Sequence, residues 1–277
     1  MSLQGGGAAV TGDSLARMPI TMATIGFCSL IWFYLWNYNV SIEKFGYQYE
    51  KVVAGRQWWR SISASYAHQH PLHLIFNMAS LWNSAVMEVT LGSVAYLKYT
   101  FLLVLLSMLT VTGMSYLAIR YFNRPRYRTV YSLGYSCVVF GWMMVQCEKL
   151  GGKMSYFGLM VPARLAPFLA LGITQLIIPN ASFIGHLSGI IVGEFIAQDF
   201  FFWFIDPVFF VVLGITCIGA GYSYMYGGSN EDESDGDGFL GFGTRTGWHR
   251  VQQDEEANEN RTEMKVVNGV LVRQTAS

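Results

Sequence analysis

The sequence predicts an all-α membrane protein, a bundle of six transmembrane helices followed by a seventh. Hydrophobic residues make up 52% of the 277 residues and charged residues only 13%, whereas soluble globular proteins carry about 25% charged residues. The apolar residues gather in seven runs, close to the roughly 20 residues that a helix needs to cross a bilayer. Polar residues separate these runs, which is the pattern of a chain that crosses a membrane repeatedly.

The first apolar run covers residues 20–40 and follows Arg17. It has no small-residue cleavage pattern, so we expect an anchor that is retained. Residues 41–70 mix Trp58 and Trp59 with scattered charges. Because tryptophan prefers the membrane–water interface, this segment is predicted to be an amphipathic interfacial loop.

The other runs carry recognisable start and stop signals. The second, 71–89, begins with Pro71 and is followed by Gly92, residues typical of a helix start and of a position just past a helix end. The third, 94–119, ends at a group of arginines, and Pro167 interrupts the fifth. The remaining runs are 129–147, 157–178, 183–202 and 208–226.

Four parts of the chain are expected. Residues 1–19 form a short N-terminal tail, 20–203 a transmembrane core, 207–226 the seventh helix and 227–277 a tail. The tail is acidic and then polar without a sustained period, so it is predicted to be disordered. The absence of an internal repeat disfavours an inverted-repeat transporter.

Composition also excludes several partners. The net charge is zero and no basic block is present, so no nucleic acid partner is expected. The four cysteines lie in apolar runs without a CxxC pair, which argues against a disulfide framework and a metal site. We expect the lipid bilayer as the surroundings and no small-molecule cofactor.

Polar side chains gather near one membrane face. Even-numbered helices of a serpentine bundle run in the same direction, so their first turns share a face. His73 and Asn77 lie in the first two turns of the second run. Ser136 lies about two turns into the fourth run, and His186 in the first turn of the sixth. Polar groups are costly inside a membrane, so their shared depth predicts a functional site.

The residue types at this depth indicate nucleophilic chemistry. Small residues repeat at every fourth position of the sixth run, at Gly185, Gly189 and Gly193, and such stripes let helices approach closely. Close approach would place Ser136 beside His186, an imidazole able to take the proton of a serine hydroxyl. No carboxylate lies at this depth, so a dyad is expected, with Phe140 packed on the imidazole. The alternative is structural, with Ser136 bonded to its own helix and Asn77 holding helices together.

Five motifs, in order along residues 20–203, resemble those of the rhomboid intramembrane serine proteases. They are Trp59-Arg60, His73-Leu-Ile-Phe-Asn77, Glu88-Val-Thr-Leu-Gly92-Ser93, Gly134-Tyr135-Ser136 and His186-Leu-Ser-Gly189. They match the family's WR, HxxxN, ExxxGS, GxSG and sixth-helix histidine motifs. The run from Gly134 to Trp142 is most similar to the plant rhomboid-like protein 13 group. The resemblance implies a rhomboid-like six-helix bundle.

The resemblance also implies catalytic roles. Ser136 would be the nucleophile and His186 the general base. His73, Asn77 and the backbone N–H of Ser136 would form the oxyanion hole, because donors aimed at developing charge accelerate acyl transfer. Structural or gate roles are implied for Arg60, His68, Phe76, Glu88, Phe140, Gly134 and Gly189.

Within that second group, Arg60 and His68 would hold the first loop. Glu88 would cap turns at the opposite face. The helix in 157–178 would be the lateral gate for substrate, lined by Phe76.

One position departs from the family pattern. Glycine usually follows the serine, and here the residue is Cys137. Its side chain is expected to narrow the oxyanion site, which puts activity in doubt. Glu194 lies within the sixth run, and no role is assigned to it.

These features predict an intramembrane serine endopeptidase that cleaves transmembrane segments of single-span membrane proteins. The alternative is a weak or inactive rhomboid pseudoprotease that binds membrane clients for trafficking or quality control, and Cys137 favours it. A channel or transporter is disfavoured because the polar cluster is confined to one face.

The sequence leaves two alternatives for the orientation of the protein in the membrane and two for the membrane in which it lies. The loops on the active-site face contain eight Lys and Arg residues and the opposite loops five, which by the positive-inside rule favours a cytosolic active-site face. The resemblance implies the reverse, with a cytosolic N-terminus. A multi-pass protein of a secretory-pathway membrane is expected, with another organelle membrane as the alternative.

Overall fold

The structure, a computed structural model, describes residues 17–156, 159–178, 181–201, 203–204, 206–227, 262–267 and 270–275. Compact units cover residues 1–234 and 235–277, and each is described by itself. Residues 1–16 of the predicted N-terminal tail, the predicted turn at Pro179-Asn180 and most of the predicted disordered tail lie outside the described residues.

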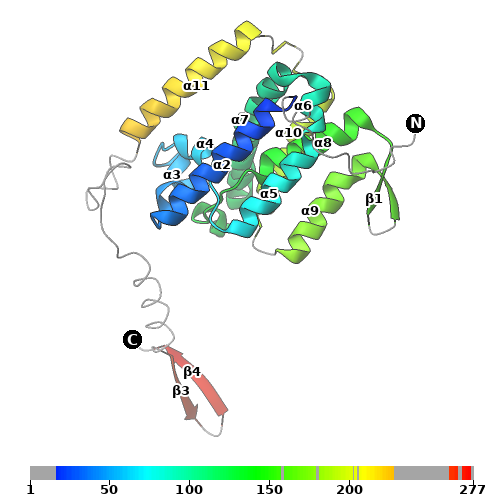
Figure 1. Ribbon diagram of the computed structural model, residues 1–277. Helices are drawn as coiled ribbons and strands as arrows, with labels where there is room; N and C mark the ends of the chain where they lie inside the picture. The colour runs from blue at the N-terminus through cyan, green and yellow to red at the C-terminus, as the bar shows by residue number, and fades with distance from the viewer. Residues whose placement is uncertain are drawn as a thin grey trace. The chain divides into compact units, whose positions relative to one another are not determined.

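The first unit is a helical bundle (Figure 1). Its longer helices, in chain order, are α2 (Pro19–Asn37), α5 (Pro71–Ser84), α7 (Ser93–Arg120), α8 (Ser136–Leu150), α9 (Ala166–Ile177), α10 (Phe183–Ala197) and α11 (Asp206–Tyr226). Shorter helices are η1 (Ile42–Lys44), α3 (Tyr49–Val53), α4 (Trp59–Tyr66), α6 (Val86–Leu91), η2 (Pro125–Arg128) and η3 (Ala163–Leu165). The seven longer helices fall on the seven predicted runs, which confirms the predicted all-α class.

The helices differ in length. Among the described residues, α2, α7 and α11 are long and apolar enough to cross a membrane. α5, α8, α9 and α10 have 14, 15, 12 and 15 residues. At 1.5 Å per residue these four extend only about 18–22 Å, less than the roughly 30 Å of a hydrocarbon core.

Several predicted boundaries were wrong. The second run divides into α5 and α6 at Ala85, the fourth helix begins at Ser136 rather than at residue 129, and the sixth ends at Ala197. The segment 41–70, predicted to be a loop, contains η1, α3 and α4. A β-bridge between Tyr47 and Ser132 ties it to the chain before α8.

The fifth run also begins differently. β1 (Lys153–Tyr156) pairs antiparallel with β2 (Leu159–Pro162), and α9 begins only at Ala166. Pro167 lies in the first turn of α9, where the missing N–H of proline sacrifices no helical hydrogen bond. The proline therefore starts this helix and does not interrupt it.

Glycines set the spacing of α8 and α10. A Cβ added at Gly189 would lie 1.9 Å from the carbonyl oxygen of Cys137, and one added at Gly193 would lie 2.4 Å from that of Gly141. The two backbones therefore touch directly, as the small-residue stripe predicted.

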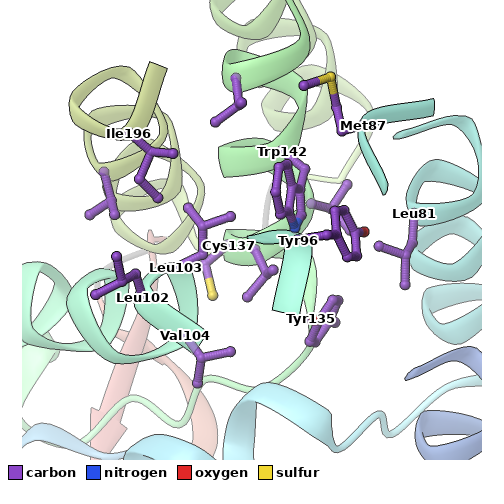
Figure 2. Packing of buried hydrophobic residues seen from close by; sticks show 14 of the residues in the cluster. Leu81, Met87, Tyr96, Leu102, Leu103, Val104, Tyr135, Cys137, Trp142 and Ile196 are labelled. Carbon is purple, nitrogen blue, oxygen red and sulfur yellow. The ribbon is translucent and has the colours of Figure 1, made fainter. Parts of the chain in front are cut away.

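A hydrophobic cluster lies on the other side of α8. Trp142 is fully buried and stacks on Tyr96 of α7, with ring centroids 4.2 Å apart (Figure 2). Its indole N–H donates to the hydroxyl of Thr100 over 3.1 Å. A buried tryptophan with a satisfied N–H fixes α7 against α8.

Glu88 caps the first helix. Its buried carboxylate accepts hydrogen bonds from the backbone N–H groups of Ile20, over 2.9 Å, and Thr21, over 2.8 Å. These are orphan donors in the first turn of α2, and a carboxylate there also complements the helix dipole. The contact is the structural role expected for Glu88.

The last helix, α11, is attached at its two ends. Asp206 accepts from Lys98 of α7 over 2.5 Å. At the other end, the Ser223 hydroxyl accepts from the backbone N–H of Trp58 over 2.6 Å, and Tyr224 packs edge-on against Trp59 of α4. Near the first end, the buried Phe209 packs edge-on against Phe101 of α7. Most of the rest of the helix is exposed (Figure 1).

The second unit contains one β-hairpin. β3 (Thr262–Val267) and β4 (Val270–Thr275) pair antiparallel, with Val267 opposite Val270. These twelve residues differ from the expectation of a disordered tail. Asn268-Gly269 separates the strands in the sequence, and this dipeptide is the favoured loop of two-residue hairpins.

Candidate active site

Ser136 is the first residue of α8, not a residue two turns inside it. The preceding Gly134 has a φ of +117°, a conformation that glycine tolerates and other residues avoid. Helical hydrogen bonding therefore cannot extend back through Gly134 to the start predicted from hydropathy. The serine lies at the positive end of the α8 dipole, with its backbone N–H unused by its own helix.

The Ser136 hydroxyl and the His186 imidazole are within hydrogen-bond distance. The Oγ and Nε2 atoms lie 3.0 Å apart. His186 lies in the first turn of α10, where the Ser182 hydroxyl caps the helix by accepting from the Gly185 N–H over 3.2 Å. The close approach of α8 and α10 thus produces the predicted contact.

Packing, not a carboxylate, orients the imidazole. The ring of Phe140 stacks on His186 with centroids 4.4 Å apart and planes 18° from parallel. In the described part of the chain, Nδ1 of His186 has no hydrogen-bond partner. Among the described residues, the hydroxyl and the imidazole therefore form a pair at hydrogen-bond distance without a third member.

His73 lies against the strained glycine before the nucleophile. A Cβ added at Gly134 would lie 2.5 Å from Cε1 of the His73 ring. Gly134 is thus needed both for its positive φ and for this close approach. His73 also packs edge-on against His68, with centroids 5.1 Å apart.

His68 contacts the segment that leads to the nucleophile. Its Nε2 accepts the backbone N–H of Tyr135 over 3.4 Å, and the side chain is fully buried. Burial and, to a lesser extent, the neighbouring His73 lower the pKa of His68 to about 4. A neutral imidazole is what an acceptor nitrogen requires. Sequence reasoning placed His68 at the first loop and did not foresee its bond to Tyr135.

Asn77 bonds to its own helix. Its Nδ2 donates to the backbone carbonyl of His73 over 2.9 Å, and the side chain is 5% exposed. The Nδ2 atom carries two N–H donors, so this bond to its own helix leaves one of them for the oxyanion role implied for Asn77.

Arg60 is buried among carbonyl oxygens of the first loop. Its Nη1 donates to Glu43 over 2.8 Å and to Gly46 over 3.3 Å, and its Nε donates to the side chain of Gln57. These bonds connect the loop to α4, as the resemblance implied.

Phe76 and Cys137 differ in their exposure: Phe76 lies on the outer surface and Cys137 in the core. Phe76 is exposed on the outer surface of α5, where a gate-lining residue would meet lipid or substrate. Cys137 is 2% exposed and its side chain belongs to the hydrophobic cluster with Leu102 and Leu103 (Figure 2). The expectation that Cys137 narrows the oxyanion site was therefore wrong in its premise, because the side chain packs in the core.

Glu194 lies near the far end of α10. Its Oε1 accepts from Gln198 over 3.0 Å and is 3.7 Å from Nη2 of Arg164, which also pairs with Glu148. The carboxylate left unexplained by the sequence is therefore part of an ion-pair group joining α8, η3 and α10. Within the described residues, no group of three or more His, Cys, Asp or Glu side chains is placed to hold a metal ion.

Comparison with known proteins agrees with this geometry. A family model described as Rhomboid domain matches residues 55–203. Human Rhomboid-related protein 4 is 31% identical over 187 residues, covering 65% of this chain and 57% of that protein. Two Arabidopsis thaliana relatives are Rhomboid-like protein 14, mitochondrial, 31% identical over 136 residues, and Rhomboid-like protein 15, 30% identical over 149.

The fold is that of a polytopic helical membrane protein, with the hydroxyl of Ser136 beside the imidazole of His186. The chain belongs to the rhomboid family. It is therefore an integral membrane protein of a family of intramembrane proteases and pseudoproteases. The two Arabidopsis matches cover 48% and 51% of this chain and 41% and 36% of those proteins, so less than two thirds of each relative's length is matched. The resemblance to the plant rhomboid-like protein 13 group stays a prediction.

Proposed function

We propose that the protein is an intramembrane serine endopeptidase that cleaves transmembrane segments of single-span membrane proteins. The observation that carries the proposal is the 3.0 Å separation of Ser136 Oγ and His186 Nε2. The stacked Phe140 supports it, because a fixed imidazole keeps its acceptor nitrogen on the hydroxyl.

The chemistry is acyl transfer. His186 takes the proton of the Ser136 hydroxyl as the oxygen attacks the scissile carbonyl, and the resulting oxyanion accepts the backbone N–H of Ser136. His73 and the second N–H of the Asn77 amide add donors. His186 then gives the proton to the leaving amine, and a water molecule, deprotonated by the same imidazole, releases the acyl group.

The short helices α8 and α9 would let water and substrate reach the dyad. α8 has 15 residues and extends about 22 Å, less than the roughly 30 Å of a hydrocarbon core. If the last residue of α8 lies at one membrane surface, its first residue, Ser136, lies below the other surface. α9 has 12 residues, with exposed apolar side chains at Phe168 and Leu176. A short, weakly packed helix is suited to move aside and admit a substrate helix.

The test uses the purified protein, a serine-reactive phosphonate probe and a single-span substrate. Wild type is expected to be labelled and to cleave, whereas Ser136→Ala and His186→Ala lose both activities. Ser132→Ala is the matched control, because its hydroxyl is four residues earlier and makes no contact with the imidazole in the described structure. Equal labelling of Ser136→Ala and wild type would exclude the dyad.

A pseudoprotease that binds membrane clients is the second candidate. The bond from Asn77 to its own helix favours it, since that bond takes one of the two amide N–H donors. A protein that captures a single-span client but is neither labelled nor able to cleave would establish this candidate.

We infer a secretory-pathway membrane as the location, in line with the expectation from the sequence. The name of one relative includes a mitochondrial location, which makes mitochondria the alternative. Imaging of a tagged full chain against markers of both membranes distinguishes them.

A further inference from the structure

A basic surface follows α7 on the face where α8 and α10 begin. It consists of four exposed arginines and two exposed aromatic side chains, Arg120, Arg124, Arg126, Arg128, Tyr121 and Phe122, and we call it the arginine corner. The two aromatic residues are 70% and 72% exposed. Arginines interleaved with exposed aromatic rings are typical of a membrane–water boundary.

The length of α7 sets the depth of this surface. Lys98, near one end, is paired with Asp206, and Arg120 is the last residue of the helix. The uncharged stretch between them, residues 99–119, extends about 32 Å as a helix, close to the roughly 30 Å of a hydrocarbon core. The arginine corner therefore lies at the level of lipid headgroups.

Backbone hydrogen bonds hold the corner in one shape. The N–H of Arg124 donates to Ala118 over 3.0 Å, and the N–H of Thr129 donates to Arg126 over 3.3 Å. Gln48 of the first loop donates to the Thr129 carbonyl over 2.8 Å. A preformed site loses less entropy on binding than a flexible basic segment.

No carboxylate in the described part of the chain neutralises the charge of the corner. The sequence contains no Asp or Glu between Glu88 and Glu148, and no ion pair in the described structure joins these arginines to a carboxylate. On the opposite face, by contrast, Lys149 pairs with Asp199. In the described loops of the active-site face, Glu43 and Glu50 are the only carboxylates that offset the basic residues. Excess positive charge at headgroup depth requires an anion.

We propose that the arginine corner binds the phosphate of an anionic phospholipid headgroup. Arginine guanidinium groups match phosphate oxygens with paired N–H donors, and each basic side chain near an anionic membrane surface contributes about 1 kcal/mol. A water-soluble acidic partner would have no use for the exposed Tyr121 and Phe122, which fit the acyl boundary beside a headgroup.

The test compares lipids on the purified full chain in neutral detergent. Phosphatidylglycerol and phosphatidylcholine with identical acyl chains are titrated, and bound lipid is counted by native mass spectrometry. Wild type is expected to prefer phosphatidylglycerol. The triple variant Arg124→Gln, Arg126→Gln, Arg128→Gln is expected to lose roughly 100-fold in that affinity, at about fivefold per arginine.

The control makes the same charge change on the opposite face, with Arg17→Gln, Lys149→Gln and Lys153→Gln. It is expected to keep the preference within about twofold, because these three residues lie on the face opposite to the arginine corner, beyond the range of a screened surface charge. Equal loss in the two triple variants, or no preference in wild type, overturns the proposal. Folding of each variant is checked by its thermal midpoint.

Two competing anions test whether the arginine corner binds a lipid, a free anion or an acidic protein segment. Inorganic phosphate at matched ionic strength is expected to leave the bound lipid in place, and displacement by phosphate assigns the corner to a free anion instead. A synthetic peptide of the acidic stretch 230–237 is expected to displace less lipid than phosphatidylserine does. The reverse order assigns the corner to acidic protein segments and overturns the lipid proposal. None of these measurements involves Ser136, so their outcome is independent of the proposed catalysis.

Discussion

Substituting Gly189 with alanine is expected to separate the dyad while leaving its two side chains unchanged. The added Cβ would lie 1.9 Å from the Cys137 carbonyl oxygen. Contacts of that kind need at least about 3 Å, so α10 must move away from α8 by roughly 1 Å. Because Ser136 and His186 are on these two helices, their 3.0 Å separation would grow past hydrogen-bond range.

The magnitude follows from two general costs. Overpacking a tight interface destabilises by about 1–3 kcal/mol. A misplacement of about 1 Å in a catalytic group lowers the rate by roughly 100-fold. We therefore expect Gly189→Ala to lower the thermal midpoint and to lose about 100-fold in cleavage by the fraction that remains folded.

The assay combines a thermal unfolding curve with cleavage per probe-labelled molecule. Gly113→Ala in α7 is the matched control, because nothing lies within 4 Å of its added Cβ, and alanine in an exposed helix stabilises by up to about 1 kcal/mol. Wild-type stability and cleavage in Gly189→Ala would show that the two backbones separate without affecting the dyad and would refute the reasoning.

The remaining predictions concern residues around the dyad. Cys137→Gly removes a side chain that is 2% exposed, so the thermal midpoint is expected to fall by an amount equivalent to about 1–3 kcal/mol, whereas cleavage per folded molecule stays near wild type; a stable, faster enzyme would contradict this. Burial lowers the pKa of His68 to about 4 from an ordinary value of 6.5, so the folded state favours the neutral ring, and the thermal midpoint is expected to fall as pH decreases from about 6.5 to 4; His68→Phe should reduce this dependence, and an unchanged pH profile would refute the assignment. Ser223→Ala removes the hydroxyl 2.6 Å from the Trp58 N–H and is expected to speed proteolysis at the end of α11 several-fold; Thr216→Ala, whose hydroxyl bonds only to Val212 of its own helix, should leave the digestion rate unchanged.

The sequence and the structure agree on where the apolar segments lie and differ on where the helices begin. Hydropathy extends the fourth run back to residue 129, but the φ of +117° at Gly134 ends helical hydrogen bonding there and makes Ser136 the first helical residue. Pro167 was interpreted as a break because proline disrupts a helix interior. Its position in the first turn of α9 depends on the preceding hairpin, which has no periodic signal strong enough to predict.

Contacts between distant segments were predictable only where a motif specified them. The pairing of Ser136 with His186 followed from the glycine stripe, because small residues force two helices together. The bond from Asn77 to its own helix and the bond from His68 to Tyr135 depend on side-chain rotamers set by tertiary packing. These rotamers cannot be inferred from the spacing of residues in the sequence.

The attachment of α11 at its two ends makes the protein sensitive to bilayer thickness. A transmembrane helix normally accommodates a mismatch with the hydrocarbon layer by tilting, at a fraction of a kcal/mol per Å. Here Asp206 and Ser223 are both fastened to other parts of the bundle, and the helix between them extends about 26 Å. Because its tilt is fixed, a thicker membrane must compress its lipids around α11 or strain the contact with the first loop. Unfolding temperature is therefore expected to be highest in vesicles whose acyl chains form a layer near that span, and to decline as the chains are lengthened.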